Sequence, residues 1–130
     1  MIDVNELKAV NDYYGHERGD EMIVRVAHLL KEVCRKTDIA ARIGGDEFAA
    51  LMPSTTLSQA ENVVQRLRNF EEHLTMLCKH KDGRELLVPI RISIGVCASD
   101  EMPPDEVFKE ADRRMYSDKD RYYAGRERYR

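Results

Sequence analysis

The sequence contains no tryptophan and only three cysteines, Cys34, Cys78 and Cys97, among its 130 residues. An odd number of cysteines without a Cys-x-x-Cys pair argues against a disulfide framework and favours a reduced, cytoplasmic protein. Cys78 and His80 lie two residues apart, but no second pair of ligands accompanies them, which argues against a structural zinc site.

Long apolar runs and a strong excess of either charge are also missing. We find no signal peptide and no apolar stretch near the length needed to cross a membrane. The net charge of −3, with no broad basic region, argues against duplex nucleic acid as the main partner. A binder of single-stranded nucleic acid would need aromatic residues spaced along a strand, and only the clustered Tyr122, Tyr123 and Tyr129 support it. With 42% hydrophobic and 35% charged residues, the chain has the composition of a single mixed α/β domain without internal repeats.

The segment 42–48 combines a pair of glycines with a pair of carboxylates. Two short runs of apolar residues, 39–41 and 49–52, flank it, a pattern that predicts a β-hairpin with the glycines at its tip. Glycine accepts a positive φ and carries no Cβ, so Gly44 and Gly45 can both turn the chain and let a phosphate approach closely.

Asp46 and Glu47 follow these glycines directly. Adjacent strand residues point to opposite faces, so only one of the two can share a metal ion with a carboxylate beneath the hairpin, unless the turn twists them together. The simpler alternative is a solvated acidic turn.

Hydrophobic periodicity predicts the remaining elements. A strand ends over residues 1–4 and should be central in the sheet. Helices are predicted over 6–14, from 19 or 20 to 36, from a Thr55 or Thr56 cap to about 78, and over 105–119, with a strand over 86–98. The third helix should bury Val63, Val64, Leu67, Phe70, Leu74 and Leu77, and the last should bury Val107, Phe108, Ala111, Met115 and Tyr116.

The string Gly-Gly-Asp-Glu-Phe at 44–48 resembles the signature of the GGDEF domains, the diguanylate cyclases of bacteria. The early motifs of that family are matched in register by 3–8, by Asn11-Asp12 and by 15–20. Two departures are visible: Asn5 stands where the family has a second Asp, and Leu7 where it has Phe. Later matches are Ile92–Val96, Ala111-Asp112, Tyr116 and Lys119.

The resemblance implies an α/β fold of the nucleotide-cyclase or palm type: a mainly antiparallel central sheet flanked by helices on both faces. It assigns two Mg²⁺ (or Mn²⁺) ions to Asp3, the carbonyl of Val4, Asp46 and Glu47, with Glu47 assisting as ligand or base. Hard cations of this kind prefer oxygen ligands.

The resemblance also assigns GTP contacts. The binding residues are Lys8, Asn11, Asp20, Gly44, Gly45 and Lys119, with Asn11 and Asp20 on the guanine and the lysines on the phosphates. Taken singly, Asn11 is also a plausible helix-end residue, Asp20 an N-cap, and the lysines solvated surface.

A second site is implied before the hairpin. In the family, Arg-x-x-Asp at the position of Arg35 and Asp38 binds the product cyclic di-GMP and restrains the enzyme, with a further arginine matched by Arg66. Arginine pairs bidentately with a guanine edge or a phosphate. The alternative is a salt-bridged helix end.

Both ends depart from the family. At the C-terminal end, the family's Lys-x-x-Gly-Arg-Asn motif is absent, and Gly125-Arg126 comes three residues late. Either an insertion has shifted the pair and Arg126 remains a phosphate ligand, or the phosphate contact is lost. The sequence slightly favours loss of the contact. Family domains begin about thirty to forty residues earlier, in a helix and loop. We therefore expect one GGDEF domain over 1–130 without its usual N-terminal helix and the first part of its first strand. It would be either a fragment of a larger protein or a domain of reduced stability with a compromised pocket wall.

The function that the resemblance implies is condensation of two GTP into cyclic di-GMP by an antiparallel homodimer, with product inhibition and with a sensory or regulatory domain N-terminal in a longer protein. The alternative is a weak or inactive module that binds GTP or cyclic di-GMP as a signalling receptor. The intact Asp46-Glu47 pair favours the enzyme. The missing N-terminal segment and the altered C-terminal motif favour the binding module.

Overall fold

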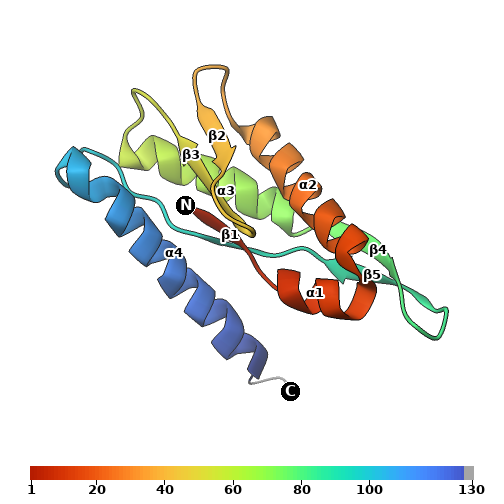
Figure 1. Cartoon of the computed structure of the whole chain (residues 1–130). Helices are drawn as coiled ribbons and strands as arrows, with labels where there is room; N and C mark the ends of the chain where they lie inside the picture. The colour runs from red at the N-terminus through yellow and green to blue at the C-terminus, as the bar shows by residue number, and fades with distance from the viewer. Residues whose placement is uncertain (128–130) are drawn as a thin grey trace.

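The computed structural model describes residues 1–127, which form a mixed α/β fold (Figure 1). The elements in chain order are β1 (Ile2–Val4), α1 (Leu7–Tyr14), α2 (His16–Val33), β2 (Ile39–Arg42), β3 (Glu47–Leu51), α3 (Leu57–Glu71), β4 (Thr75–Lys79), β5 (Glu85–Pro89), β6 (Ile92–Ile94) and α4 (Pro104–Glu127). Four strands make an antiparallel sheet in the order β2-β3-β1-β6, and β4 and β5 form a separate hairpin. Among the described residues, no helix is both long and apolar enough to span a membrane.

β1 occupies the centre of the four-stranded sheet, as predicted. Its Asp3 lies opposite Glu47 of β3 on one side and Ser93 of β6 on the other. Because strand residues alternate between faces, Ile2 and Val4 point away from Asp3 and enter the hydrophobic core. The strand thus separates an apolar face from a face that carries polar groups.

The core lies between the sheet and α2. Met22, Val26 and Leu30 follow one stripe of α2 and are almost completely buried. α3 packs beside α2, whereas α4 crosses the other side of the molecule against β6 and β1 (Figure 1). Helices on both faces agree with the predicted fold class.

Gly95 permits this close packing of α4. A Cβ atom built at Gly95 would lie 2.0 Å from the carbonyl oxygen of Ala111 and 2.2 Å from the backbone nitrogen of Met115. No real Cβ can occupy that space without moving the helix backbone. Glycine here therefore fixes how near α4 comes to the end of β6.

The third helix is shorter than its predicted extent to residue 78. It begins after Thr56, which forms a capping box with Gln59, and it ends at Glu71. Beyond it, Met76 and Cys78 are buried while Leu77 is 50% exposed, the alternation of a strand. Phe70 is also exposed, so the prediction that Phe70 and Leu77 face the core is wrong. The helical spacing of leucines concealed a change of period after residue 71.

The strand predicted over 86–98 is divided between two sheets. β5 pairs with β4, and after Pro89 the chain passes to β6, which pairs with β1. The amide of Ile90 donates to the carbonyl of Leu74, and the carbonyl of Arg91 accepts from the amide of Asn5. The alternation of side chains continues across this passage, so periodicity alone could not reveal the change of partner strand.

Two helix boundaries also differ. α2 starts at His16, directly after Gly15 with its φ of 93°, and ends at Val33. α4 continues eight residues beyond the predicted end at Lys119, to Glu127. In α4, Ala111 and Met115 are buried as predicted, whereas Phe108 and Tyr116 are 59% and 47% exposed.

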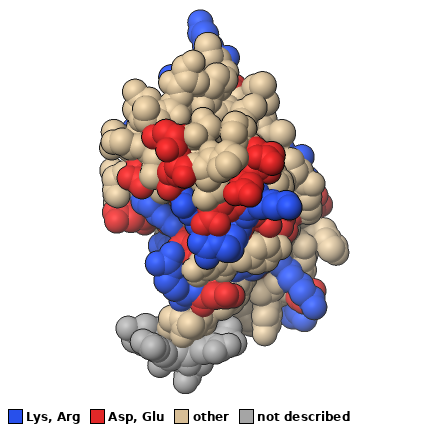
Figure 2. All heavy atoms as spheres, turned by 90° about the vertical axis from the view of Figure 1, so that its left-hand side faces the viewer, with Lys and Arg blue, Asp and Glu red and all other residues tan. Residues whose placement is uncertain are grey.

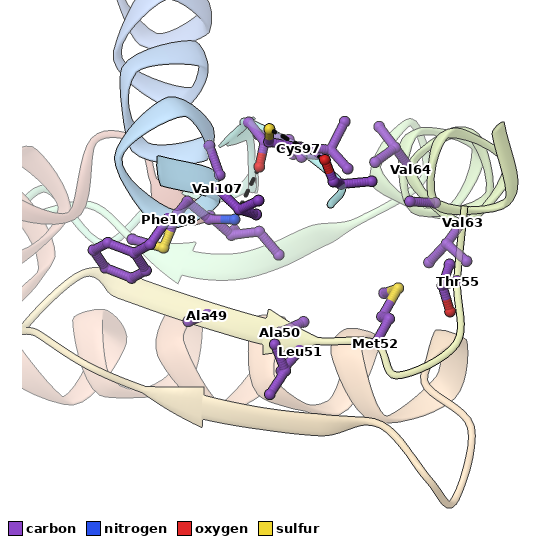
Figure 3. Close-up of a pocket in the computed structure, with 18 of the residues that line it drawn as sticks. Ala49, Ala50, Leu51, Met52, Thr55, Val63, Val64, Cys97, Val107 and Phe108 are labelled. Carbon is purple, nitrogen blue, oxygen red and sulfur yellow. Dashed lines mark hydrogen bonds between the residues drawn. The ribbon is translucent and has the colours of Figure 1, made fainter. Parts of the chain in front are cut away.

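An apolar groove of about 490 Å³ lies between α3, α4 and β3 (Figure 3). Val63 and Val64 of α3, Val107 and Phe108 of α4 and Leu51 of β3 are among the residues that line it. We call this the apolar groove. It holds none of the carboxylates singled out in the sequence.

Candidate metal and phosphate site

Three carboxylates meet where β1 and the hairpin lie side by side. One oxygen from each of Asp3, Asp46 and Glu47 lies within 4.8 Å of the others. Glu47 is opposite Asp3 in the strand register, and Asp46 is fixed in the turn because its carbonyl accepts from the amide of Val4 at 2.8 Å. The turn thus brings both tip carboxylates to Asp3, the arrangement that strand alternation alone would forbid.

Asp3 is 1% exposed, and its Oδ1 accepts no well-formed hydrogen bond from the residues described. The ammonium of Lys119 lies 3.3 Å from this oxygen as an ion pair. Burial, and then repulsion by Asp46, raise the pKa of Asp3 to about 6, although Lys119 acts in the opposite direction. Burial and the neighbouring carboxylates together therefore outweigh the attraction of Lys119.

This arrangement fits a divalent cation. A buried oxygen without a good donor and three converging carboxylates provide the hard oxygen ligands that Mg²⁺ and Mn²⁺ prefer. The cluster combines residues from β1 and from the hairpin, 43 or more positions apart in the sequence.

A polar pocket of about 490 Å³ adjoins the carboxylates. It is lined by Val4, Glu6, Leu7, Lys8, Ala9, Asp12, Tyr13, Asp46, Lys119, Tyr123 and Arg126. Three of these side chains are cationic: Lys8 from α1, and Lys119 and Arg126 from α4. Cations beside a candidate metal site are what binding of a polyphosphate requires.

The position of Arg126 bears on the two alternatives drawn from the sequence. Because α4 continues without a break, Lys119, Tyr123 and Arg126 stand at i, i+4 and i+7 and share one helix face. The late arginine therefore reaches the same pocket as Lys119. The helix predicted from the sequence ended at Lys119, so the prediction missed that Arg126 shares this helix and this pocket. The signal was available, because no Pro or Gly interrupts residues 119–124.

Gly44 and Gly45 do not have positive φ angles, so the conformational reason for them at the hairpin tip is wrong. A Cβ at Gly45 would meet no atom within 4 Å, and one at Gly44 would make ordinary contact with Glu47. Instead, the guanidinium of Arg42 closes the tip by donating to the carbonyls of both glycines. The open space at Gly45 leaves the second reason, close approach of a ligand, as a prediction.

Asn11 packs directly against α2. A Cβ at Gly19 would lie 1.7 Å from Oδ1 of Asn11, so the side chain of Asn11 occupies the space that the glycine leaves free. Asp20, the next residue, is exposed. The predicted guanine-binding residues thus lie where α1 meets the first turns of α2, and neither lines the polar pocket described above.

Arg35 and Asp38 form an ion pair between α2 and β2. The guanidinium donates to Asp38 at 2.9 Å and also to Oγ1 of Thr55 and the carbonyl of Pro53. Hydrogen bonds from Arg35 hold the pKa of Asp38 below its usual range. An ion pair of this kind is expected under both interpretations of the motif, so binding of cyclic di-GMP there stays a prediction. Arg66 lies on the exposed surface of α3.

The surface over α4 carries acidic and basic side chains in alternation, without a broad patch of one sign (Figure 2). Ion pairs of Glu110 with Arg113 and Arg114, and of Glu101 with Arg114, account for much of this pattern. The polar pocket is mixed in the same way, because Glu6, Asp12 and Asp46 line it together with the three cationic side chains.

An antiparallel sheet between helices, with a carboxylate cluster beside a polar pocket that three cationic side chains line, defines a protein suited to bind phosphate together with a divalent cation. Comparison with known proteins agrees. Residues 1–124 match the family model described as "Diguanylate cyclase, GGDEF domain". The chain therefore belongs to the GGDEF family.

Curated relatives include diguanylate cyclase A of Treponema denticola, 34% identical over 119 residues, and the response regulator PleD of Caulobacter vibrioides, 34% identical over 120 residues. Both matches cover 92% of this chain but only 31% and 26% of the relatives. Among solved structures, the GGDEF domain of DgcB from Caulobacter crescentus, in complex with c-di-GMP, aligns with a TM-score of 0.76 and 28% identity over 91% of this chain and 68% of that one.

Proposed function

We propose that this chain is a diguanylate cyclase domain that joins two GTP molecules into cyclic di-GMP. The observation that carries the proposal is the convergence of Asp3, Asp46 and Glu47 beside a pocket with three cationic side chains. In this reaction the 3′-hydroxyl of each GTP attacks the α-phosphate of the other, and pyrophosphate leaves. Membership of the family and the diguanylate cyclases among its relatives support the assignment.

The carboxylates and the carbonyl of Val4 would hold two Mg²⁺ or Mn²⁺ ions. Bound there, the ions would neutralise charge on the reacting phosphates and lower the pKa of the attacking hydroxyl. Glu47, opposite Asp3 in the sheet, is the residue suited to accept the proton from that hydroxyl.

Lys8 and Lys119 line the polar pocket and would hold the phosphates. The open space at Gly45 would let the phosphates pass close to the hairpin backbone, with Gly44 beside it. Asn11 and Asp20 would bind the guanine, since a carboxylate accepts from its N1–H and amino group while an amide can both donate and accept.

Catalysis would require two copies of the chain, because each holds one GTP and supplies half of the reaction centre. A two-fold arrangement closes such a pair. Turnover per chain should then increase with protein concentration in the range where the dimer is incomplete.

Regulation would act through cyclic di-GMP bound at Arg35, Asp38 and Arg66. A sensory or regulatory domain before this one, in a longer cytoplasmic protein, would supply the input.

The deciding experiment is GTP turnover by the purified chain with Mg²⁺, with cyclic di-GMP detected by chromatography. Asp46→Ala and Glu47→Ala should abolish the product while leaving the fold intact by circular dichroism. If the chain gives no product but binds cyclic di-GMP saturably, and Arg35→Ala removes that binding, the enzyme assignment fails and the domain is a receptor.

A further inference from the structure

The end of α4 contacts the loop between β1 and α1 across the polar pocket. Arg126 Nη1 lies 2.8 Å from Oε2 of Glu6, and the amide of Glu6 donates to the hydroxyl of Tyr123 at 3.0 Å. All three residues line the pocket. Figure 1 shows the last turns of α4 running toward the start of α1.

We propose that Glu6 is a built-in competitor of the substrate: its carboxylate occupies Arg126, and the triphosphate of GTP must displace it. The inference rests on the proposed function, because it assumes that the polar pocket takes a polyphosphate. It adds an autoinhibitory contact, which we call the Glu6–Arg126 latch.

The charges of the pocket support this reading. Lys119 is paired with Asp3 at 3.3 Å, and Arg126 is paired with Glu6. Two of the three cations that line the pocket are thus neutralised by carboxylates of the chain itself. A guanidinium binds phosphate in the same bidentate geometry as carboxylate, and a triphosphate carries more negative charge. The same cation can therefore pass from the internal anion to the substrate.

Glu6 is held in place by more than this ion pair. Its backbone has φ 68° and ψ 13°, the left-handed region, which is unfavourable for a residue with a Cβ and so must be held by its surroundings. The hydroxyl of Tyr123 accepts a hydrogen bond from the backbone amide of Glu6. The ring of Tyr123 packs edge-on against Tyr122, with the ring centroids 5.0 Å apart. The carboxylate of Glu6 is 19% exposed and so is largely confined to the pocket. An ion pair free in solvent would not be fixed in this way.

Arg126 is itself positioned from its own helix. Its guanidinium donates to the hydroxyl of Tyr122 at 3.3 Å and lies 6.0 Å from that ring. These contacts do not involve Glu6, so Arg126 remains aimed at the pocket when the latch opens. Removal of Glu6's charge should therefore release a preorganised phosphate ligand.

The test is equilibrium binding of α,β-methylene GTP, which cannot react, by calorimetry in Mg²⁺. Glu6→Gln keeps the hydrogen bond from the backbone amide of residue 6 to Tyr123 and should bind the nucleotide about three- to tenfold more tightly than the wild type. Arg126→Ala should bind the nucleotide about tenfold more weakly than the wild type. The double variant should equal Arg126→Ala, because Glu6 acts through Arg126. Glu61→Gln, on the exposed surface of α3, changes the net charge equally and should leave the affinity unchanged.

Opposite signs for the two substitutions distinguish a latch from an ordinary stabilising ion pair. If the wild type binds the nucleotide and Glu6→Gln binds it equally or more weakly, the latch is refuted and the proposed function stands. If neither the wild type nor Glu6→Gln binds, the nucleotide assignment of the pocket fails as well. Binding by Glu6→Gln alone supports both.

Discussion

At the scale of single residues, the site is defined by charges that repel one another in the absence of a ligand. Asp3 is buried close to Asp46 and Glu47, and its pKa is raised to about 6 first by burial and then by repulsion from Asp46. The chain retains these groups at the expense of its own stability. Perturbed pKa values of this kind are common at functional sites.

Replacing Asp3 should therefore stabilise the metal-free chain. The pKa of Asp3 is raised to about 6 in the folded state, so the folded chain holds a proton that the unfolded chain releases near pH 4. The free energy of unfolding should fall as the pH rises through this window and stay lower above it. Asp3→Asn should gain roughly 1–3 kcal/mol at about pH 7.5 and little at about pH 4.

Urea denaturation in a metal chelator measures this gain. Addition of Mg²⁺ or Mn²⁺ should raise the stability of the wild type but not that of Asp3→Asn, since binding to the folded state alone stabilises it. A variant less stable than the wild type at both pH values would contradict the electrostatic explanation.

Two glycines offer a matched comparison between folding and binding. Gly45→Ala places a methyl group in open space and should change the free energy of unfolding by less than about 1 kcal/mol, while weakening GTP binding severalfold. Gly95→Ala would force its methyl group into the backbone of α4 and should cost several kcal/mol, on the order of 3. Thermal denaturation and nucleotide titration of both variants separate the effects. Equal loss of stability in the two would show that the tip glycine serves the fold.

At the scale of elements, the free edge of β6 is satisfied by side chains in place of a strand. The carboxylate of Glu71 in α3 accepts a hydrogen bond from the backbone amide of Ile92 at 2.6 Å, and that of Asp118 in α4 accepts one from the backbone amide of Ile94 at 2.8 Å. Arg68 joins them by pairing with both carboxylates and donating to the carbonyl of Ile92. This network ties α3 and α4 to the sheet, and α4 carries Lys119, the residue after Asp118.

Loss of the network should loosen α4 as well as the edge. Asp118→Ala leaves a strand amide and a guanidinium without their partner, which should cost about 1–3 kcal/mol. Arg68→Ala should cost a similar amount, and the double variant should lose clearly less than the sum because the residues share one network. A double-mutant cycle by chemical denaturation measures the coupling. Strictly additive losses would show that Arg68 and Asp118 act independently.

At the scale of the whole molecule, the apolar groove limits how much surface the described fold buries. Leu51 and Phe108 on its walls are 66% and 59% exposed. Apolar surface left in water contributes nothing to the hydrophobic stabilisation of the fold. The expectation of reduced stability, drawn from the missing first part of the first strand, therefore stays a prediction.

The isolated chain should melt no higher than ordinary mesophilic domains, about 45–65 °C, and its native state should bind an apolar fluorescent dye. Leu51→Lys and Phe108→Lys should reduce dye binding without lowering the melting temperature, because both side chains are already exposed. Far-UV circular dichroism and dye fluorescence test this. A cooperative transition well above that range would refute the expected instability.

The sequence by itself determined the hairpin, the central strand with Asp3, the α/β class and the family, because local hydrophobic patterns and a contiguous motif carry that information. It could not locate the end of α3 or the passage from β5 to β6, since hydrophobic spacing does not record which strand is the partner. Only the tertiary structure decided that the turn brings Asp46 and Glu47 together at Asp3. It also decided that a late arginine reaches the pocket and meets Glu6 there, because those contacts join residues 120 positions apart.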